Sequence, residues 1–301
     1  MVSWQGYIDR IIIRKMYKNS WNAPVLELRQ KIENNVKKNA RWLRLPKNIE
    51  VLPVSVGGLP SEWIIPLKST RDKVILYIHG GGHFMGSCNT YRALAAYIAE
   101  ASNVRVLLLE YRLAPEHPFP TPLDDTIAGY RWLLNEGISP HNIVIAGDSA
   151  GGNLCLASII SLRDQKSPLP SAVVCLSPDT DLSWSGGSIK TNANIDPMLT
   201  VDVLSMIKLY IGNNDPCHPL ISPLYADLHG LPPMLIQVGS HEIMLSDSTR
   251  FADKARNAGV DVTLKVWDGM WHVFQSTGLS LPEARQAINE IGVFVKKHLG
   301  V

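Results

Sequence analysis

The chain has 301 residues, of which 46% are hydrophobic and 19% are charged, and its formal net charge is +2. This composition is ordinary for a globular protein and argues against a largely disordered or fibrous chain. No apolar run approaches the roughly 18 residues of a membrane span, so we expect no stable membrane insertion. The first residues carry charges where a signal peptide needs its apolar core, which favours a cytoplasmic protein.

The charge is unevenly distributed along the chain. Residues 1–50 contain eleven Lys and Arg against four Asp and Glu, whereas the rest of the chain is net acidic. A basic amphipathic start is one signature of a segment that touches anionic lipid. We favour instead two short helices packed on the body, because the basic residues are interleaved with Val25, Leu28 and Ile32 at core spacing. The basic residues form no aromatic-interleaved motif, so no nucleic-acid partner is expected.

The four cysteines lie far apart in the sequence, at Cys88, Cys155, Cys175 and Cys217. They form no CxxC pair, and no zinc-ligand spacing pairs them with the nine histidines. We therefore predict free thiols in a reducing compartment and no metal site.

Residues 1–45 are predicted to be helical, and from residue 51 apolar strands alternate with helices. The predicted strands are 51–56, 63–67, 73–79, 104–110, 143–146, 172–177, 234–239 and 262–266. The predicted helices are 90–101, 122–135, 153–162, 200–211, 246–257 and 281–298. This alternation indicates an α/β fold with a mostly parallel sheet covered by helices on both faces. In such sheets the ligand site lies beyond the carboxyl ends of the strands.

A serine stands between the strand at 143–146 and the helix at 153–162, in the sequence GDSAG of residues 147–151. Such a tight strand–helix turn is strained, and a glycine two residues before and after the serine removes Cβ atoms that would clash. The turn projects the hydroxyl above the sheet edge, and the following helix points N–H groups at developing negative charge. A phosphate-binding turn is the alternative, but the P-loop lysine and the dinucleotide spacing are missing. We therefore predict that Ser149 is a nucleophile.

Three consecutive glycines follow the third predicted strand, in the sequence His79-Gly80-Gly81-Gly82. A glycine backbone can turn its N–H groups inward and approach a substrate oxygen closely. Acyl transfer needs such donors because the attacked carbonyl oxygen becomes an oxyanion. We assign this role to the N–H groups of Gly81, Gly82 and Ala150, the residue after the nucleophile. We expect His79 to shape the loop rather than to transfer protons.

A serine hydroxyl needs a base, and in this class of fold the acid and then the histidine follow the serine along the chain. His272 fits the base because it follows the strand at 262–266 and precedes the last helix. The acid is expected after the strand at 234–239, where Glu242 and Asp247 are both candidates. We predict Glu242 because it is closer to the strand end. Asp247 falls at the start of the next helix, where a negative charge is favourable in its own right.

These motifs resemble those of the hormone-sensitive-lipase-like branch of the α/β-hydrolase carboxylesterases, especially its bacterial members. The resemblance covers roughly residues 50–301. The motifs that carry it are His79–Gly82, Tyr111–Glu116, Phe119-Pro120 followed by Asp125, Gly147–Gly152, Ser177-Pro178, Asp196-Pro197, Ser222-Pro223 and His272–Phe274.

The resemblance implies an α/β-hydrolase fold, with an eight-stranded sheet in a catalytic domain of residues 46–301. It also implies a small helical cap over the site, built here from residues 1–45 and from an insertion at about 181–215. Five residues of these segments are candidates either for lining the substrate pocket or for the core of the cap. They are Trp4, Trp21, Trp184, Met198 and Leu199.

For the site, the resemblance implies a triad of Ser149, His272 and a carboxylate, with Gly80 and Asp148 as supporting motif residues. The family commonly has Asp-Pro at the acid position, whereas this chain has Glu242-Ile243 there, 30 residues before His272. The resemblance further implies metal-free hydrolysis of small-molecule esters without a cofactor, and frequent homodimers.

Together these observations predict a serine carboxylesterase that hydrolyses short- to medium-chain acyl esters through an acyl-enzyme intermediate. An amidase or deacetylase would use the same residues, because esters and amides share the tetrahedral intermediate. A non-catalytic small-molecule-binding protein of the same fold is disfavoured by His272. The only sign of an interfacial lipase is the basic N-terminal segment.

Overall fold

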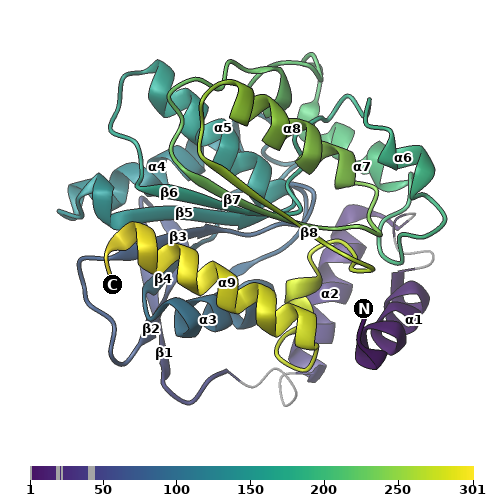
Figure 1. The fold of residues 1–301 in the computed structure, drawn as a ribbon, viewed down its shortest axis with the longest axis horizontal. Coiled ribbons are helices and arrows are strands. Elements are labelled where there is room, and N and C mark those ends of the chain that lie inside the picture. Colours follow the sequence, from purple (N-terminus) through teal and green to yellow (C-terminus); the bar gives the residue numbers. More distant parts are fainter. Residues whose placement is uncertain (1, 18–20, 22, 40–44) are drawn as a thin grey trace.

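The computed structural model describes residues 2–17, 21, 23–39 and 45–301. A central twisted sheet lies between two layers of helices, and helix α1 lies at an outer edge of the molecule (Figure 1). The helices α3 (Cys88–Ser102) and α9 (Pro282–Leu299) pack on each other and on one face of the sheet. The opposite face is covered by α4 (Thr121–Asn135), α5 (Ala150–Asp164) and α8 (Leu245–Asn257).

The sheet that the described residues form has eight strands in the order β1-β2-β4-β3-β5-β6-β7-β8. Strand β2 is antiparallel to both of its neighbours, and the pairs from β4 through β8 are all parallel. The strands are β1 Ile49–Val56, β2 Leu59–Pro66, β3 Val74–Ile78, β4 Arg105–Leu109, β5 Ile143–Asp148, β6 Ala172–Leu176, β7 Met234–Gly239 and β8 Val262–Trp267. The predicted α/β class with an eight-stranded, mostly parallel sheet is therefore confirmed.

The central strands are buried on both faces, as their continuous apolar sequences predict. In β3, Ile75 and Tyr77 join the core beneath α3 and α9, whereas Leu76 and Ile78 join the core on the other side. All of these side chains are fully buried. This burial holds the carboxyl ends of β3, β5 and β6 in fixed positions, and the loops that follow them are anchored accordingly.

Helix α5 begins at Ala150, three residues earlier than predicted, and β5 continues to Asp148. The prediction ended the strand and delayed the helix because glycine usually interrupts both. Here the glycines allow close packing instead: a Cβ on Gly151 would lie 2.0 Å from the carbonyl oxygen of Ile78. The turn between β5 and α5 is therefore reduced to Ser149 alone.

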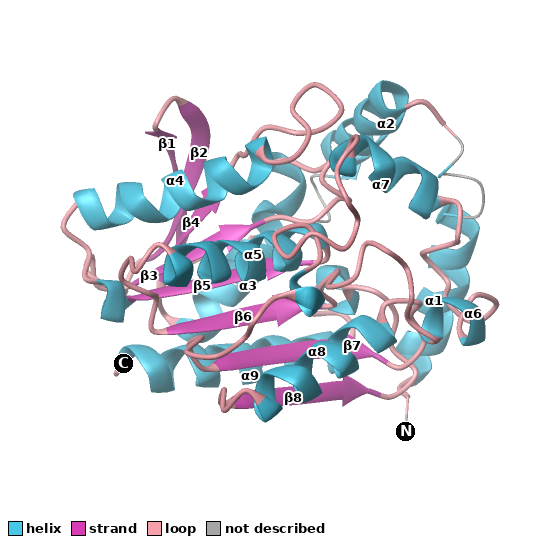
Figure 2. Cartoon of the chain, turned by 90° about the horizontal axis from the view of Figure 1, so that it is seen from above, coloured by secondary structure: helices cyan, strands magenta, loops and turns pink. Residues whose placement is uncertain are grey.

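Four helices lie beyond the carboxyl ends of the central strands (Figure 2). They are α1 (Trp4–Tyr17), α2 (Val25–Asn39), α6 (Ser188–Thr191) and α7 (Val203–Ile211). Residues 40–44 of the segment predicted to be helical lie outside the described residues. On α2, Leu28 is buried and Val25 and Ile32 pack against the core, as expected from their spacing. None of the helices in the described part of the chain combines the length and the apolar character needed to cross a membrane.

The remaining described elements are three short 3-10 helices, η2 (Pro140–Asn142), η3 (Pro223–Tyr225) and η4 (Phe274–Thr277). Sequence reasoning expected the stretch from 178 to 233 to be a loop around one helix. It proved to contain α6 and η3 in addition to α7.

Candidate active site

Ser149 occupies a strained turn between β5 and α5. Its backbone has φ 51° and ψ −122°, a conformation that is unfavourable for a residue with a Cβ. Its N–H donates to the carbonyl oxygen of Leu176 at 2.8 Å, and its own carbonyl oxygen accepts from Asn153 at 3.0 Å. A Cβ on Gly147 would lie 2.7 Å from the backbone of Gly151. The two glycines are thus required by close backbone contacts around the serine.

The imidazole of His272 joins Ser149 to Glu242. His272 Nε2 lies 2.9 Å from Ser149 Oγ, and His272 Nδ1 lies 2.8 Å from Glu242 Oε2. Because a carboxylate only accepts, Nδ1 carries the proton, and in the neutral ring Nε2 is free to accept from the serine hydroxyl. These three predicted residues therefore lie in one chain of hydrogen bonds, although they come from three separate strand ends.

Glu242 is held from its other oxygen as well. Its Oε1 accepts from Gly239 N–H at 2.5 Å and from Ser177 Oγ at 2.9 Å. Ser177 Oγ in turn accepts from the N–H of Val273 at 3.2 Å, which ties the acid loop to the histidine loop. The sequence indicates Ser177 only as part of a motif and predicts no role for it. Its place directly after β6, at the same sheet edge, was the available signal.

Asp247, the alternative acid, does not contact His272. Its Oδ2 accepts from the N–H groups of Thr180 and Asp181, both at 2.9 Å. It lies in the first turn of α8 and holds the loop after β6. The structure thus brings Glu242, and not Asp247, to the imidazole.

Charges around His272 favour its protonated form. Burial alone lowers the pKa of the imidazole, but the hydrogen bond and the charge of Glu242, with the charges of Asp179 and Asp196, raise this pKa to about 9. Burial raises the pKa of Asp179 and of Asp196 to about 6. The site is therefore built to stabilise an imidazolium next to the serine hydroxyl.

The glycine loop after β3 borders the same space. Gly81 and Gly82 have φ of +112° and +62°, conformations that side chains rarely adopt. A Cβ on Gly81 would lie 2.2 Å from the carbonyl oxygen of Met85. Within the described residues, the N–H groups of Gly81, Gly82 and Ala150 donate to no protein acceptor. Three amide hydrogens are thus available beside Ser149.

His79, Gly80 and Asp148 support this loop from beneath. The ring of His79 stacks between Tyr91 and Tyr111, with ring centroids 5.3 and 4.3 Å apart. Burial lowers the pKa of His79 to about 4, so the ring is neutral, and its Nδ1 bonds the carbonyl oxygen of Gly80 at 2.8 Å. Asp148 Oδ1 accepts from Gly80 N–H at 3.1 Å. These contacts fix the loop, and His79 Nε2 makes no hydrogen bond among the described residues, so none joins His79 to Ser149.

A cavity of about 600 Å³, here named the active-site cavity, opens onto Ser149, His272, Gly81 and Gly82. Three of the five candidate cap residues line it, namely Trp21, Met198 and Leu199. Trp4 is 69% exposed and Trp184 packs against the core, and neither lines the cavity.

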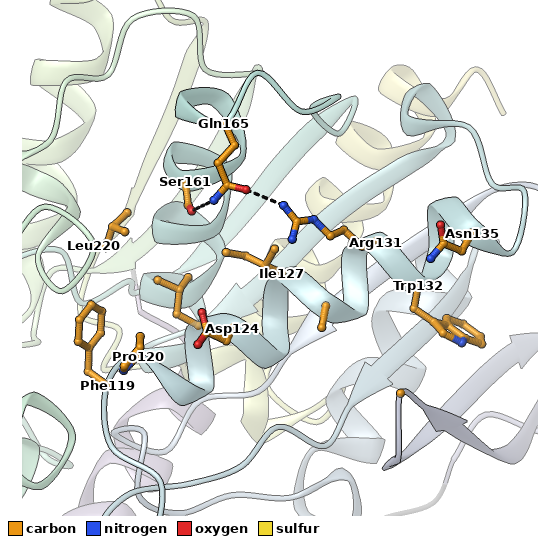
Figure 3. Close-up of a pocket in the computed structure, with 13 residues that line it drawn as sticks. Phe119, Pro120, Asp124, Ile127, Arg131, Trp132, Asn135, Ser161, Gln165 and Leu220 are labelled. Carbon is orange, nitrogen blue, oxygen red and sulfur yellow. Dashed lines mark hydrogen bonds between the residues drawn. The ribbon is translucent and has the colours of Figure 1, made fainter.

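A second hollow of similar size lies away from these residues, along α4, and is here named the α4 groove (Figure 3). It measures about 580 Å³ and runs between α4, α5 and the β1–β2 turn. Arg131 Nη2 donates to Gln165 Oε1 at 2.5 Å, and Gln165 Nε2 donates to Ser161 Oγ at 2.9 Å. None of the predicted site residues lines the α4 groove.

The chain is similar in sequence and in structure to known proteins. Residues 75–276 match the family described as alpha/beta hydrolase fold. The chain is 41% identical to an acetyl-hydrolase of Streptomyces hygroscopicus over 248 residues, which are 82% of this chain and 83% of that protein. It is also 41% identical to an esterase of Acinetobacter venetianus over 253 residues, 83% of each chain. The crystal structure of an esterase from the bacterial hormone-sensitive lipase family has a TM-score of 0.94 at 43% identity and covers all of both chains.

Proposed function

Because the chain belongs to the α/β-hydrolase fold family and, within it, to the bacterial hormone-sensitive-lipase-like esterases, we propose that it hydrolyses short- to medium-chain acyl esters through a serine acyl-enzyme. The observation that carries this proposal is the hydrogen-bonded chain from Ser149 through His272 to Glu242, at 2.9 and 2.8 Å. A nucleophile next to a base that is itself oriented by a carboxylate is the arrangement that acyl transfer requires.

In the first half of the reaction, Ser149 Oγ attacks the ester carbonyl carbon while His272 Nε2 takes its proton. The carbonyl oxygen becomes an oxyanion, which accepts from the N–H groups of Gly81, Gly82 and Ala150. Glu242 holds the ring in the correct tautomer and stabilises the imidazolium. His272 then gives its proton to the leaving alcohol, and the acyl group remains on Ser149.

In the second half, His272 takes a proton from water, which attacks the acyl-enzyme carbonyl. The oxyanion forms again on the same three N–H groups and collapses with release of the carboxylic acid. Ser149 recovers its proton from His272. No metal or cofactor takes part in this scheme.

We also assign the described helices of residues 1–45 and 181–215 to a cap over the active-site cavity. Trp21 Nε1 donates to the carbonyl oxygen of Met198 at 3.0 Å, and Arg14 donates to that of Asn194 at 2.9 Å. The two segments, far apart in sequence, thus contact each other above the site. Both contribute apolar side chains to the cavity wall, which suits an acyl chain.

Labelling with a fluorophosphonate, followed by mass spectrometry of the intact protein and of its peptides, tests the proposal. We expect one added label, on the peptide that contains Ser149, and none on Ser149→Ala. Persistent labelling of that variant would place the nucleophile elsewhere. Turnover of a phenyl ester against the matching anilide separates an esterase from an amidase.

A further inference from the structure

A buried carboxylate that the proposed mechanism does not require lines the active-site cavity. Asp179 follows β6, and its side chain is 1% exposed. Its N–H lies 3.4 Å from the carbonyl oxygen of Ser149, and its own carbonyl oxygen accepts from Asn153 Nδ2 at 2.7 Å. The backbone of Asp179 is therefore fixed beside the nucleophile.

The carboxylate of Asp179 lacks the partners that its neighbours have. Its Oδ1 is buried and accepts no hydrogen bond from the residues that the structure describes. By contrast, Asp181 Oδ2 accepts from Arg250 at 2.9 Å, and Asp247 Oδ2 accepts from two backbone N–H groups. A buried carboxylate without donors is costly unless something in the cavity donates to it.

Apart from the imidazolium form of His272, the described lining of the cavity supplies no cation to balance this charge. Its described lining contains two carboxylates, Asp148 and Asp179, and neither lysine nor arginine. Asp148 Oδ2, like Asp179 Oδ1, has no hydrogen-bond partner among the described residues, but Asp148 Oδ1 already accepts from Tyr77 at 2.9 Å and from Gly80. Apart from His272, the charge that a substrate meets beside Ser149 is therefore negative, and Asp179 is the carboxylate with the larger unmet need for a donor.

We propose that Asp179 is a substrate-binding residue that selects esters carrying a protonated amino group a few bonds from the scissile carbonyl. An ammonium group would donate to Asp179 and neutralise it at a buried position, where such a contact is strong. This inference rests on the proposed esterase function and specifies its substrate class.

Two isosteric substrate pairs test it at pH 7.5, where the amines are protonated. One pair is β-alanine ethyl ester and ethyl butyrate, with the amino group on the acyl side. The other is 3-(dimethylamino)propyl butyrate and 4-methylpentyl butyrate, with the amino group on the alcohol side. The quantity measured for each pair is the kcat/KM of the amino ester divided by that of the neutral ester. We expect Asp179→Asn to lower this ratio at least fivefold in one pair, mainly by raising the KM of the amino ester. A smaller change in both pairs overturns the proposal.

The neutral esters separate this proposal from the proposed function. If the native enzyme hydrolyses none of the four esters, the esterase proposal itself fails. If Asp179→Asn does not fold, competitive inhibition of the native enzyme replaces the variant. We then expect n-butylammonium to inhibit hydrolysis of p-nitrophenyl butyrate at least fivefold more strongly than 1-butanol, and equal inhibition overturns the proposal.

A second, independent observation concerns the outer face of α1. Gly6 and Ile13 face the body. Gly6 lies close to Met270, and Ile13 packs against the hydrophobic cluster that contains Met270. The opposite face is apolar and exposed to between 47% and 69%. Its large side chains are Trp4, Tyr7, Ile8, Ile11, Ile12 and Met16.

Basic groups accompany this apolar face. Lys15 and Arg14 are exposed on α1 and make no ion pair among the described residues, although the Arg14 guanidinium also donates to the carbonyl oxygens of Asn194 and Ile195. A second copy of this helix would bring like charges together across a twofold axis, whereas an anionic surface would complement them. Trp4 and Tyr7 are also side chains that favour the boundary between lipid and water.

The geometry points to α1 as a helix that docks on an anionic lipid surface. Met16 is 58% exposed on this helix and also lines the active-site cavity. A docked α1 would therefore place the cavity entrance next to the lipid, where apolar esters concentrate.

Co-sedimentation of the full chain with vesicles tests the docking. We expect binding to phosphatidylglycerol vesicles, at least tenfold weaker binding to phosphatidylcholine, and a tenfold loss in the Ile8→Gln/Ile11→Gln double variant. Val293→Gln, at a 65% exposed position on α9, is the matched control and should bind as the native chain does. Absence of binding to phosphatidylglycerol overturns the proposal. The proposal is also overturned if sedimentation velocity shows a dimer of the native chain that is lost in the double variant, while both proteins bind vesicles equally.

Discussion

The active-site cavity and the α4 groove are nearly equal in volume, about 600 and 580 Å³, yet they differ in what their walls can do. The described wall of each contains one buried serine: Ser149 in the cavity and Ser161 in the groove. Ser149 stands in a strained turn at φ 51°, 2.9 Å from an imidazole. Ser161 lies inside helix α5, and its hydroxyl accepts from Gln165. Volume therefore does not distinguish the two hollows. The strained backbone of Ser149 and the imidazole beside its hydroxyl do.

The polar groups of the two regions also differ in their exposure to water. In the cavity, Glu242 and His272 are buried, and burial strengthens each of their interactions. In the α4 groove, Arg131 and Gln165 are exposed, so water competes for their hydrogen bond (Figure 3). If the chemistry is confined to the active-site cavity, substitutions there should lower activity far more than substitutions in the α4 groove.

The largest effect is expected from Ser149→Ala. Removing the nucleophile should lower kcat for p-nitrophenyl butyrate by about a millionfold, the scale known for triad serines. Because the hydroxyl is hydrogen-bonded only to His272 among the described side chains, the melting temperature should change little. A variant that keeps more than a hundredth of the native kcat would contradict the assignment.

Glu242→Gln is expected to have the next largest effect. An amide can donate to Nδ1 and so favour the wrong tautomer, which should lower kcat on the order of 10³- to 10⁴-fold. Asp247→Asn is the matched control, because Asp247 is also buried and also follows β7, but binds backbone N–H groups rather than His272. A greater loss of kcat in Asp247→Asn than in Glu242→Gln would reverse the choice of acid.

The pH dependence of kcat/KM should reflect the negative charges around His272. The base must be neutral, and the pKa of His272 is raised to about 9, so kcat/KM for ethyl butyrate should rise with pH through about 9. Removing a neighbouring negative charge disfavours the imidazolium. Asp196→Asn should therefore move the acidic limb of the kcat/KM profile, where the rate rises with pH, to lower pH. Hydrolysis of ethyl butyrate followed by pH-stat titration measures this shift. A limb at the same pH in both proteins would show that Asp196 does not act on the imidazole.

Much of this site follows from the sequence because its residues sit at ends of strands that apolar runs identify. The order of Ser149, Glu242 and His272 along the chain, each after a strand, was enough to place them at one sheet edge. The structure brings these three together as expected. The glycines of the serine turn were likewise readable, since Gly147 and Gly151 are needed by contacts within a few residues of the turn.

What the sequence did not reveal depends on distant contacts. Ser177 and Asp179 follow β6 just as Ser149 follows β5, but nothing in their own sequence shows that one contacts Glu242 and that the other lacks a donor. The start of α5 was missed because Gly151 packs against Ile78, which is 73 residues earlier. The exposed face of α1 was missed because apolar helical spacing is the same whether the face is covered or not.

The smallest effect is expected in the α4 groove. Arg131→Ala removes the hydrogen bond to Gln165, which joins two exposed side chains and contributes little to stability. We expect kcat and KM for p-nitrophenyl butyrate to change by less than about twofold, the range typical of surface substitutions. Kinetics and thermal unfolding of Arg131→Ala beside Ser149→Ala measure this contrast. A tenfold loss of activity in Arg131→Ala would mean that the two hollows are coupled, since no predicted site residue lines the groove. A native rate would instead confine the chemistry to the cavity where the strained serine and the imidazole meet.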